Sequence, residues 1–271
     1  MKVEVFSIEG KATGSIELPK EFSAKVDTEL IKRAVLAIQS AGVQAKAPYL
    51  MAGRNNTSVY VGSRSKPTVW RGINVEKARK PRLKNRRFLI AGQVAGIPGV
   101  VGGPRAHPPK IEKVWGEKIN AKEKRKATVS AIAATAKPEL VKARGHIVPE
   151  GMKLPLVVET KFEGLAKSSE VVEALGKLGI YADVERVKAK RTIRAGKGKK
   201  RGRVHRTGKS VLIVAADSSK IFLGARNLSG VEVVRARDIN AEILAPGALC
   251  GRLTLWTEGA LKAMAAGPKA N

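Results

Sequence analysis

The sequence predicts an α/β fold, a three-layer domain with a mainly parallel sheet, together with a long extended basic loop. Short apolar, β-rich runs alternate with helical patterns along most of the chain. The run VLIVAA at 211–216 is apolar without alternation, which is typical of a strand covered on both faces. By contrast, residues 43–110 show no sustained period of 2 or 3.6 residues, and nine of the 18 residues in 92–109 are glycine or proline. That segment is therefore predicted not to pack within the domain.

The first elements are a strand and a helix. Residues 3–8 (VEVFSI) alternate as a half-buried strand does. Asp27 is placed to cap a helix that runs to about residue 41 and ends at Gly42. One face of this helix is apolar, formed by Ile31, Val35 and Ile38.

The next helix is expected after the long irregular segment. Asn120, with Glu123 three residues later, resembles a capping box. The helix should stop before Pro138. Its expected buried face consists of Val129, Ile132, Ala133 and Ala136. Further strands are expected at 156–158, 211–216, 231–234 and 253–256, with helices near 169–178 and 258–266.

The positive charge is concentrated in two segments. The chain has 52 Lys and Arg against 23 Asp and Glu, a formal net charge of +29. Residues 46–110 carry a net +13 and residues 186–209 carry a net +12, whereas the rest of the chain is nearly balanced. Such runs indicate a polyanionic partner, because each cation placed on a phosphate releases counterions. Nucleic acid is the leading candidate, and an anionic membrane surface is the other.

Composition argues against several other classes of protein. No apolar run approaches the roughly 20 residues that a membrane span needs, and the first residues lack the apolar core of a signal peptide. Cys250 is the only cysteine, so neither an intramolecular disulfide nor a cysteine-rich zinc site is expected. These features predict a cytoplasmic protein with no membrane contact, metal or other cofactor.

Patterns that suggest catalysis are weak. The stretch GRVHRTGKS at 202–210 resembles a phosphate-binding loop, but Arg203 stands where the pattern needs glycine and the stretch precedes a strand. The three histidines, at 107, 146 and 205, are far apart and have no cysteine companions. A lone histidine is more often structural or solvated than a ligand, although His205, in the basic run, could stack on a base or contact phosphate. No catalytic residue is predicted.

Aromatic residues in the long basic segment are better candidates for a ligand contact. Trp70, with Tyr49 and Tyr60 nearby, lies where the chain has no core of its own. Such a ring can stack on a base or enter an RNA crevice, although a local cluster packed on itself is the alternative. Trp256, on an expected strand, is assigned to the core. The glycines near residue 200 miss the spacing of a dinucleotide loop and instead allow a basic backbone to approach phosphates.

Short motifs follow one another in an order that resembles a known family. They are AHPPK at 106–110 followed by Glu112-Lys113, 120–123 with ATA at 134–136, RGH at 144–146, GKGKKRGR at 196–203, ARNL at 225–228 with Gly230, DINAEILAPG at 238–247 and GRLTLWTEGAL at 251–261. In these stretches, which cover most of the chain, the sequence resembles the L-four family of large-subunit ribosomal proteins in its archaeal and eukaryotic form. Residues 54–103 match least, because GSRSKPTVWRG replaces the family's Gly/Arg-rich loop tip.

The resemblance implies a structural constituent of the large ribosomal subunit. Such a protein binds rRNA early in subunit assembly, contacts several rRNA domains and extends a loop to the wall of the nascent-polypeptide exit tunnel. The implied partners are large-subunit rRNA, neighbouring large-subunit proteins and the nascent chain. The chain is expected to be a monomer within the cytoplasmic ribosome.

Charge and resemblance together divide the chain. A globular α/β domain is expected at 1–44 and 109–271, an extended rRNA-penetrating loop at 45–108 and a second basic rRNA-binding loop at 186–209. The residues expected to contact rRNA are Arg54, Arg64, Lys66, Trp70, Arg71, Lys77, Arg79, Lys80, Arg82, Lys84, Arg86, Arg87, Arg105, His107, Lys110, Arg191, Arg194, Lys197, Lys199, Lys200, Arg201, Arg203, His205 and Arg206. The residues expected at the tunnel tip are Ser63, Arg64, Ser65, Lys66, Pro67 and Thr68.

Two alternatives belong to other functional classes. A basic α/β RNA-modifying enzyme would need a cofactor-binding glycine turn after the first strand, where the sequence offers Gly10 and no helix start. A DNA-binding protein would need a recognition helix, and the basic runs are not expected to be helical.

Overall fold

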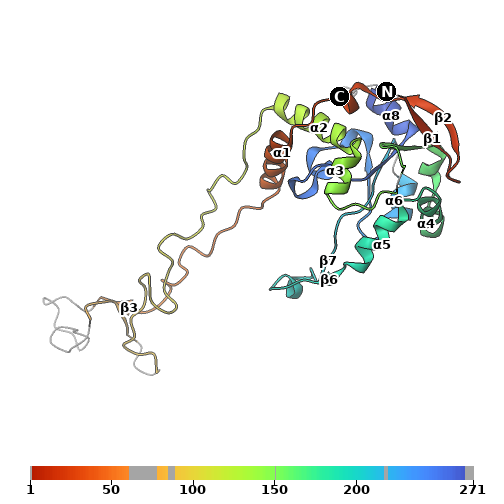
Figure 1. Cartoon of the computed structure of the whole chain (residues 1–271). Coiled ribbons are helices and arrows are strands. Elements are labelled where there is room, and N and C mark those ends of the chain that lie inside the picture. Colours follow the sequence, from red (N-terminus) through yellow and green to blue (C-terminus); the bar gives the residue numbers. More distant parts are fainter. Residues whose placement is uncertain (1, 61–77, 85–88, 150, 217–218, 266–271) are drawn as a thin grey trace. The chain divides into compact units, whose positions relative to one another are not determined.

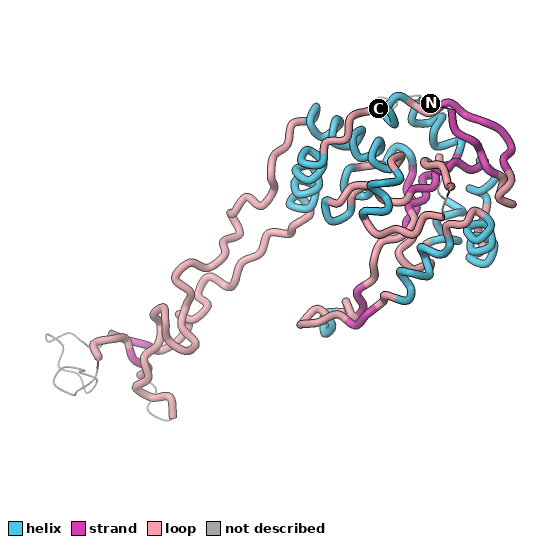
Figure 2. The backbone as a smooth tube through the Cα atoms, viewed as in Figure 1, coloured by secondary structure: helices cyan, strands magenta, loops and turns pink. Residues whose placement is uncertain are grey.

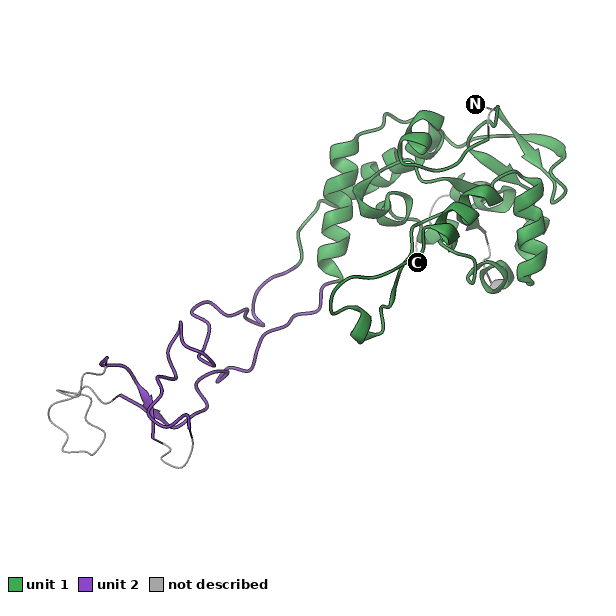
Figure 3. Ribbon diagram, turned by 60° about the horizontal axis from the view of Figure 1, so that its bottom comes forward, with its two compact units in different colours: residues 1–42, 116–271 green, residues 43–115 purple. Residues whose placement is uncertain are grey.

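The structure is a computed structural model that describes residues 2–60, 78–84, 89–149, 151–216 and 219–265. The chain forms two compact units (Figure 3). Unit 1 comprises residues 1–42 and 116–271, and unit 2 comprises residues 43–115. Each unit is described by itself.

Unit 1 is built on a six-stranded sheet with the order β2-β1-β5-β10-β8-β9. The strands are β1 (Lys2–Phe6), β2 (Ala12–Glu17), β5 (Leu156–Val158), β8 (Leu212–Ala215), β9 (Glu232–Arg235) and β10 (Thr254–Thr257). β1 and β2 form an antiparallel hairpin, and every other pair in the sheet is parallel. The expected mainly parallel sheet is confirmed, with one antiparallel edge strand, β2, that the sequence pattern did not indicate.

Helices cover both faces of this sheet (Figure 1). One face packs against α4 (Ser168–Lys177), α5 (Tyr181–Ala189) and α6 (Ser219–Ala225). The opposite face packs against α1 (Thr28–Ala41), α2 (Ala121–Thr135), α7 (Ala241–Leu244) and α8 (Glu258–Ala265). The short helix α3 (Pro138–Ala143) follows α2, and 3₁₀ turns lie at Lys20–Ser23, Thr160–Gly164, Lys199–Arg201, Ala236–Asp238 and Pro246–Ala248. The three-layer prediction is thus confirmed.

The central strand β8 explains why its sequence does not alternate. Successive side chains of a strand point to opposite faces. Ile213 therefore belongs to one core cluster and Leu212 to the other, and both are fully buried. The side chains of the neighbouring strand β10 also alternate between the two core clusters, with Leu255 in the first and Trp256 in the second. Trp256 is fully buried, as expected, and meets the Phe22 ring edge to face with 5.2 Å between ring centroids.

The helix termini confirm one predicted cap and correct another. Asp27 accepts a hydrogen bond from the Leu30 amide at 3.0 Å and so caps α1 as expected. Asn120 precedes α2 but its side chain makes no capping bond, so the capping-box interpretation was wrong. Glu123 instead pairs with Arg33 of α1, with 3.3 Å between Oε2 and Nη1. The Glu123 carboxylate therefore links α2 to α1 by an ion pair.

The two points where the chain leaves and re-enters unit 1 are held together. The Glu117 amide donates a hydrogen bond of 2.9 Å to the hydroxyl of Ser40, near the end of α1. Residues 43–115 are therefore inserted between adjacent positions of unit 1.

Unit 2 has little regular structure in its described part (Figure 2). β3 (Ser58–Val59) pairs antiparallel with β4 (Arg82–Leu83). The rest consists of irregular chain, an isolated bridge between Arg82 and Val94, and turns, several of them at glycines with positive φ such as Gly53 and Gly96. Among the described residues of the unit only Ala95 and Pro104 are buried, so it has almost no core.

We expect this contrast to appear in amide hydrogen exchange of the free protein. Amides of 43–60 and 89–115 should exchange rapidly, because almost no apolar burial offsets an ordering entropy of about 1–2 kcal/mol per residue. Amides of β5, β8 and β10 should exchange slowly and serve as the internal reference. Protection in 89–115 equal to that of these strands would contradict the prediction.

Candidate nucleic-acid interface

The second basic segment forms a hairpin that projects from unit 1 after α5. β6 (Thr192–Ile193) pairs antiparallel with β7 (His205–Arg206), and the Arg194 amide donates to the Val204 carbonyl at 2.8 Å. The turn contains the 3₁₀ turn Lys199–Arg201 and then Gly202, whose φ of +82° requires a glycine. The segment is not a loop throughout: residues 186–189 are the last turn of α5, which corrects the expectation that the basic runs lack helix.

The hairpin carries cations without local counter-charges. Residues 190–206 contain nine Lys and Arg and no acid. All nine are exposed except the half-buried Arg194, and none forms an ion pair within the part of the chain that the structure describes. They include the expected contacts Arg191, Arg194, Lys197, Lys199, Lys200, Arg201, Arg203 and Arg206, and His205 is exposed beside them. This dense, unneutralised charge suits a phosphate backbone.

The hairpin is anchored at its base by a buried carboxylate. Asp183 of α5 is fully buried and accepts hydrogen bonds from Ser210 Oγ at 2.8 Å and Arg186 Nε at 2.9 Å. Its Oδ2 also lies 3.0 Å from His146 Nδ1, which must carry a proton because an ionised carboxylate can only accept. The Ile147 amide donates to Oδ1 at 3.0 Å. Arg186 precedes the hairpin and Ser210 follows it, so one side chain fixes both of its ends.

Burial alone would raise the pKa of the Asp183 carboxyl. The hydrogen bonds from His146, Arg186 and the Ile147 amide outweigh burial and hold the pKa well below its ordinary value. Although Ser210, His146 and Asp183 are residue types of a catalytic triad, both Ser210 and His146 face the same carboxylate oxygen, and all three are buried. A triad needs serine bonded to histidine. The arrangement is structural.

A buried cation completes the anchor. Arg252 of the segment before β10 is fully buried and donates to Glu232 Oε2 at 2.6 Å, Ser210 O at 3.0 Å and Ile243 O at 3.0 Å. Glu232 also pairs with Lys209. Burial would raise the Glu232 pKa, but its bonds to Lys209 and Arg252 lower it overall. Lys209 and Ser210 are thus held by the protein itself and precede a strand, which excludes the phosphate-loop interpretation of 202–210.

Sequence reasoning did not foresee this anchor. Two of its members, His146 and Arg252, come from the motif stretches 144–146 and 251–261, which indicate only the family resemblance. Arg252 stands among apolar residues that enter a strand, and a charge in such a place is a signal of a buried pair.

Unit 2 carries the other described candidates. Arg54, Arg79, Lys80, Lys84, Arg105, His107 and Lys110 are exposed and form no ion pair among the described residues. Arg82 differs, because it is half-buried and donates to the carbonyls of Gly92 at 2.9 Å and Ala78 at 3.1 Å. Part of its hydrogen-bonding capacity therefore holds the local fold of unit 2.

The remaining predicted contacts lie outside the described residues. They are Arg64, Lys66, Trp70, Arg71, Lys77, Arg86 and Arg87, together with the tip residues Ser63, Ser65, Pro67 and Thr68. Elsewhere, no described helix is long and apolar enough to cross a membrane. The described His, Cys, Asp and Glu side chains also form no group of three that could hold a metal ion.

Comparison with known proteins identifies the family. The ribosomal protein L4/L1 family matches residues 16–267. The chain belongs to this family. Among similar proteins, the large ribosomal subunit protein uL4 of Methanopyrus kandleri is 46% identical over 264 residues, which are 97% of this chain and 98% of that protein. The proteins of the same name from Methanoculleus marisnigri and Archaeoglobus fulgidus are 45% and 43% identical, each over 97% of this chain and 98% and 97% of their own lengths.

Membership of the L4/L1 family confirms the resemblance drawn from the motifs, including its archaeal character. It makes the chain a ribosomal protein and decides against the enzyme alternative.

Proposed function

We propose that the chain is an rRNA-binding constituent of the large ribosomal subunit in the cytoplasm, present as a monomer among neighbouring subunit proteins. Its relatives of matching length are named as large-subunit proteins, which supports the placement. We further propose that it binds several rRNA domains early and so supports subunit assembly.

One observation carries the rRNA-binding proposal. The cations of the hairpin 190–206 have no acidic partner among the described residues, whereas Arg186, Lys209 and Arg252 at its base are all paired. The protein therefore neutralises the cations at the base of the hairpin and leaves those along the hairpin unpaired, so that an external polyanion could bind them. A surface of this kind gains from counterion release when phosphates replace the solvent ions.

The long insertion is proposed to reach the nascent-polypeptide exit tunnel. Residues 46–110 provide two arms of about 30 residues, and at roughly 3.3 Å per extended residue each could span on the order of 100 Å. Cations lie on both arms, as at Arg54 and Arg105, and could anchor them on rRNA. The middle, near Gly62–Gly72, contains Ser63, Pro67 and Thr68, which would face the tunnel.

Deleting residues 63–71 tests this assignment. The deletion variant should enter large subunits, because the cations at 79–84 and the hairpin remain, but nascent-chain passage or sensitivity to tunnel-blocking antibiotics should change. Incorporation is measured by sedimentation after a salt wash, and passage by translation with the purified ribosomes.

Two outcomes would count against the proposal in different ways. Loss of incorporation with unchanged translation in surviving ribosomes would make the deleted residues an assembly anchor. Release of the full-length chain from large subunits by the salt wash would contradict rRNA binding itself.

A further inference from the structure

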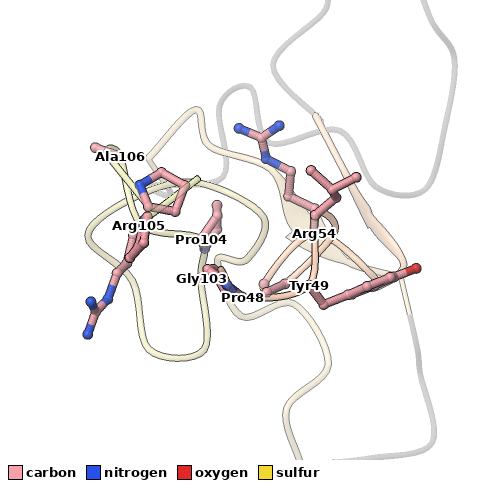
Figure 4. A pocket seen from close by; sticks show the side chains of 12 residues that line it. Pro48, Tyr49, Arg54, Gly103, Pro104, Arg105 and Ala106 are labelled. Atoms are coloured by element: carbon pink, nitrogen blue, oxygen red, sulfur yellow. The ribbon is translucent and has the colours of Figure 1, made fainter. Parts of the chain in front are cut away.

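A cleft of about 420 Å³ lies wholly within unit 2 (Figure 4). Its walls come from two stretches that are far apart in sequence, 48–54 and 103–109. Prolines form much of its surface, among them Pro48, Pro104 and Pro108. Tyr49 also lines it, with 69% of that residue exposed to solvent. The volume lies within the range of small-molecule sites.

The cleft is built by close backbone packing. Gly53 has a φ of +77°, and a Cβ at this position would lie 2.4 Å from Gly103 C. Only glycine allows the two stretches to approach so closely. Turn hydrogen bonds fix the first wall, since the amides of Ala52 and Arg54 donate to Tyr49 O and Met51 O at 2.9 Å and 2.8 Å. In this structure the walls are thus formed by local backbone contacts rather than by a core.

The chemistry of the cleft points to a ligand that is both flat and anionic. No acidic residue lines it. Arg54 and Arg105 line it, and their guanidiniums lie apart and point in different directions in Figure 4. Neither has an ion-pair partner among the described residues. An aromatic ring and rigid proline surfaces suit a planar, apolar group, while two separated guanidiniums suit phosphates at either side of it.

We propose that this cleft holds a single unstacked base of large-subunit rRNA, with Tyr49 stacked on the base and Arg54 and Arg105 on the phosphates that flank it. The inference rests on the proposed rRNA-binding function and names the RNA feature that unit 2 recognises. A base within a duplex is already stacked on both faces, so the site selects a bulged or single-stranded nucleotide.

The test measures binding of the full-length chain to large-subunit rRNA of the same organism. Tyr49→Ala should weaken binding by about 5- to 150-fold, the range found when a stacking aromatic is removed. Tyr49→Phe keeps the ring and should bind like the unaltered chain. Phe222→Ala is the matched control, since Phe222 is an exposed aromatic in unit 1 outside both basic segments.

Salt dependence separates stacking from charge. Arg54→Gln with Arg105→Gln should reduce the slope of log affinity against log salt by about one for each phosphate that no longer has a cation on it. Tyr49→Ala should leave that slope unchanged. Ultraviolet crosslinking of the same complex should place a nucleotide adduct on the peptide that contains Tyr49.

Several results would overturn the proposal. Unchanged binding by Tyr49→Ala, while the unaltered chain binds rRNA, would remove the base site and leave the proposed function standing. Equal losses of rRNA affinity in Tyr49→Ala and Phe222→Ala would show that the loss does not depend on the cleft. A crosslink from Tyr49 to another protein in assembled subunits would assign the cleft to a protein neighbour. If the unaltered chain did not bind rRNA, the proposed function itself would fail.

Discussion

Replacing Asp183 by alanine should lower the free energy of unfolding of unit 1 by about 3–5 kcal/mol, the effect of removing one partner from a buried ion pair. Four donors converge on this carboxylate, from His146, Ser210, Arg186 and the Ile147 amide. In the alanine variant they would remain buried, or nearly so, without an acceptor. In a domain of this size each kcal/mol moves the thermal midpoint by about 2–4 °C.

A surface carboxylate provides the control for this substitution. Glu170 pairs with Lys167 at 3.7 Å, and both side chains are well exposed. Exposed pairs typically contribute at most about 1 kcal/mol. Glu170→Ala should therefore unfold almost like the unaltered chain in thermal and urea denaturation. Equal destabilisation by the two substitutions would show that the Asp183 network does not hold unit 1 together.

The lowered pKa of Asp183 gives the same network a signature in pH. Because the folded pKa lies below the unfolded value of about 3.9, the group contributes its full stability above roughly pH 5. That contribution is lost as the pH falls through about 4 toward the folded pKa, by up to about 1.4 kcal/mol per pH unit. Asp183→Asn has no ionisable group at this position, so it lacks this dependence on pH. Its stability should differ most from that of the unaltered chain near neutral pH, and the difference should shrink in acid.

Local patterns predicted the sheet because its strands are short and buried on both faces. β5 and β8 are recognisable as apolar runs, since a strand covered on two sides presents mostly apolar side chains. β10 (TLWT) is also buried throughout, although it contains two threonines. The edge strand β2 was not predicted. Its sequence, ATGSIE, is mostly exposed and contains a glycine, and it is a strand because it pairs with β1 rather than through its own pattern.

Helix α5 illustrates the same limit at the site. Its buried positions include Asp183, and a charged residue there interrupts the apolar periodicity that marks a helix. What makes the charge acceptable is its pairing with His146 and Ser210, which are 37 and 27 positions away along the chain. No local pattern encodes such a contact. The exposed cations, which have no protein partner, were the part of the site that composition could locate.

Composition could not separate paired from unpaired cations within the basic run 186–209. The structure does so: Arg186 and Lys209, at the two ends, bond to Asp183 and Glu232. The ten cations between them, all exposed except the half-buried Arg194, form no ion pair among the described residues. A count of charges from the sequence therefore overstates the number of cations available to RNA at the base of the hairpin. Along the hairpin itself, the count gives the correct number. This division determines which substitutions should affect binding without affecting folding.

Changing Arg201, Arg203 and Arg206 together to glutamine should reduce affinity for large-subunit rRNA by roughly two decades near 0.1 M salt, with phosphate contacts in duplex DNA as the guide. The slope of log affinity against log salt should flatten by about 2–3, because each phosphate that is no longer neutralised changes it by about 0.9. All three residues are exposed and lie outside the buried anchor, so the thermal midpoint should not move. Titration of rRNA at several salt concentrations measures both quantities.

A second triple substitution separates local contact from overall charge. Lys2, Lys153 and Lys167 are exposed in unit 1 and pair with Glu17, Glu4 and Glu170. Changing these three to glutamine lowers the net charge by the same amount as the hairpin variant. Each of these substitutions removes a lysine that pairs with a glutamate of the same protein and not with a phosphate of the RNA. The slope of log affinity against log salt should therefore stay close to that of the unaltered chain. Equal slopes for the two variants would mean that rRNA senses the chain's total charge, and the hairpin would lose its assignment as a phosphate-binding element.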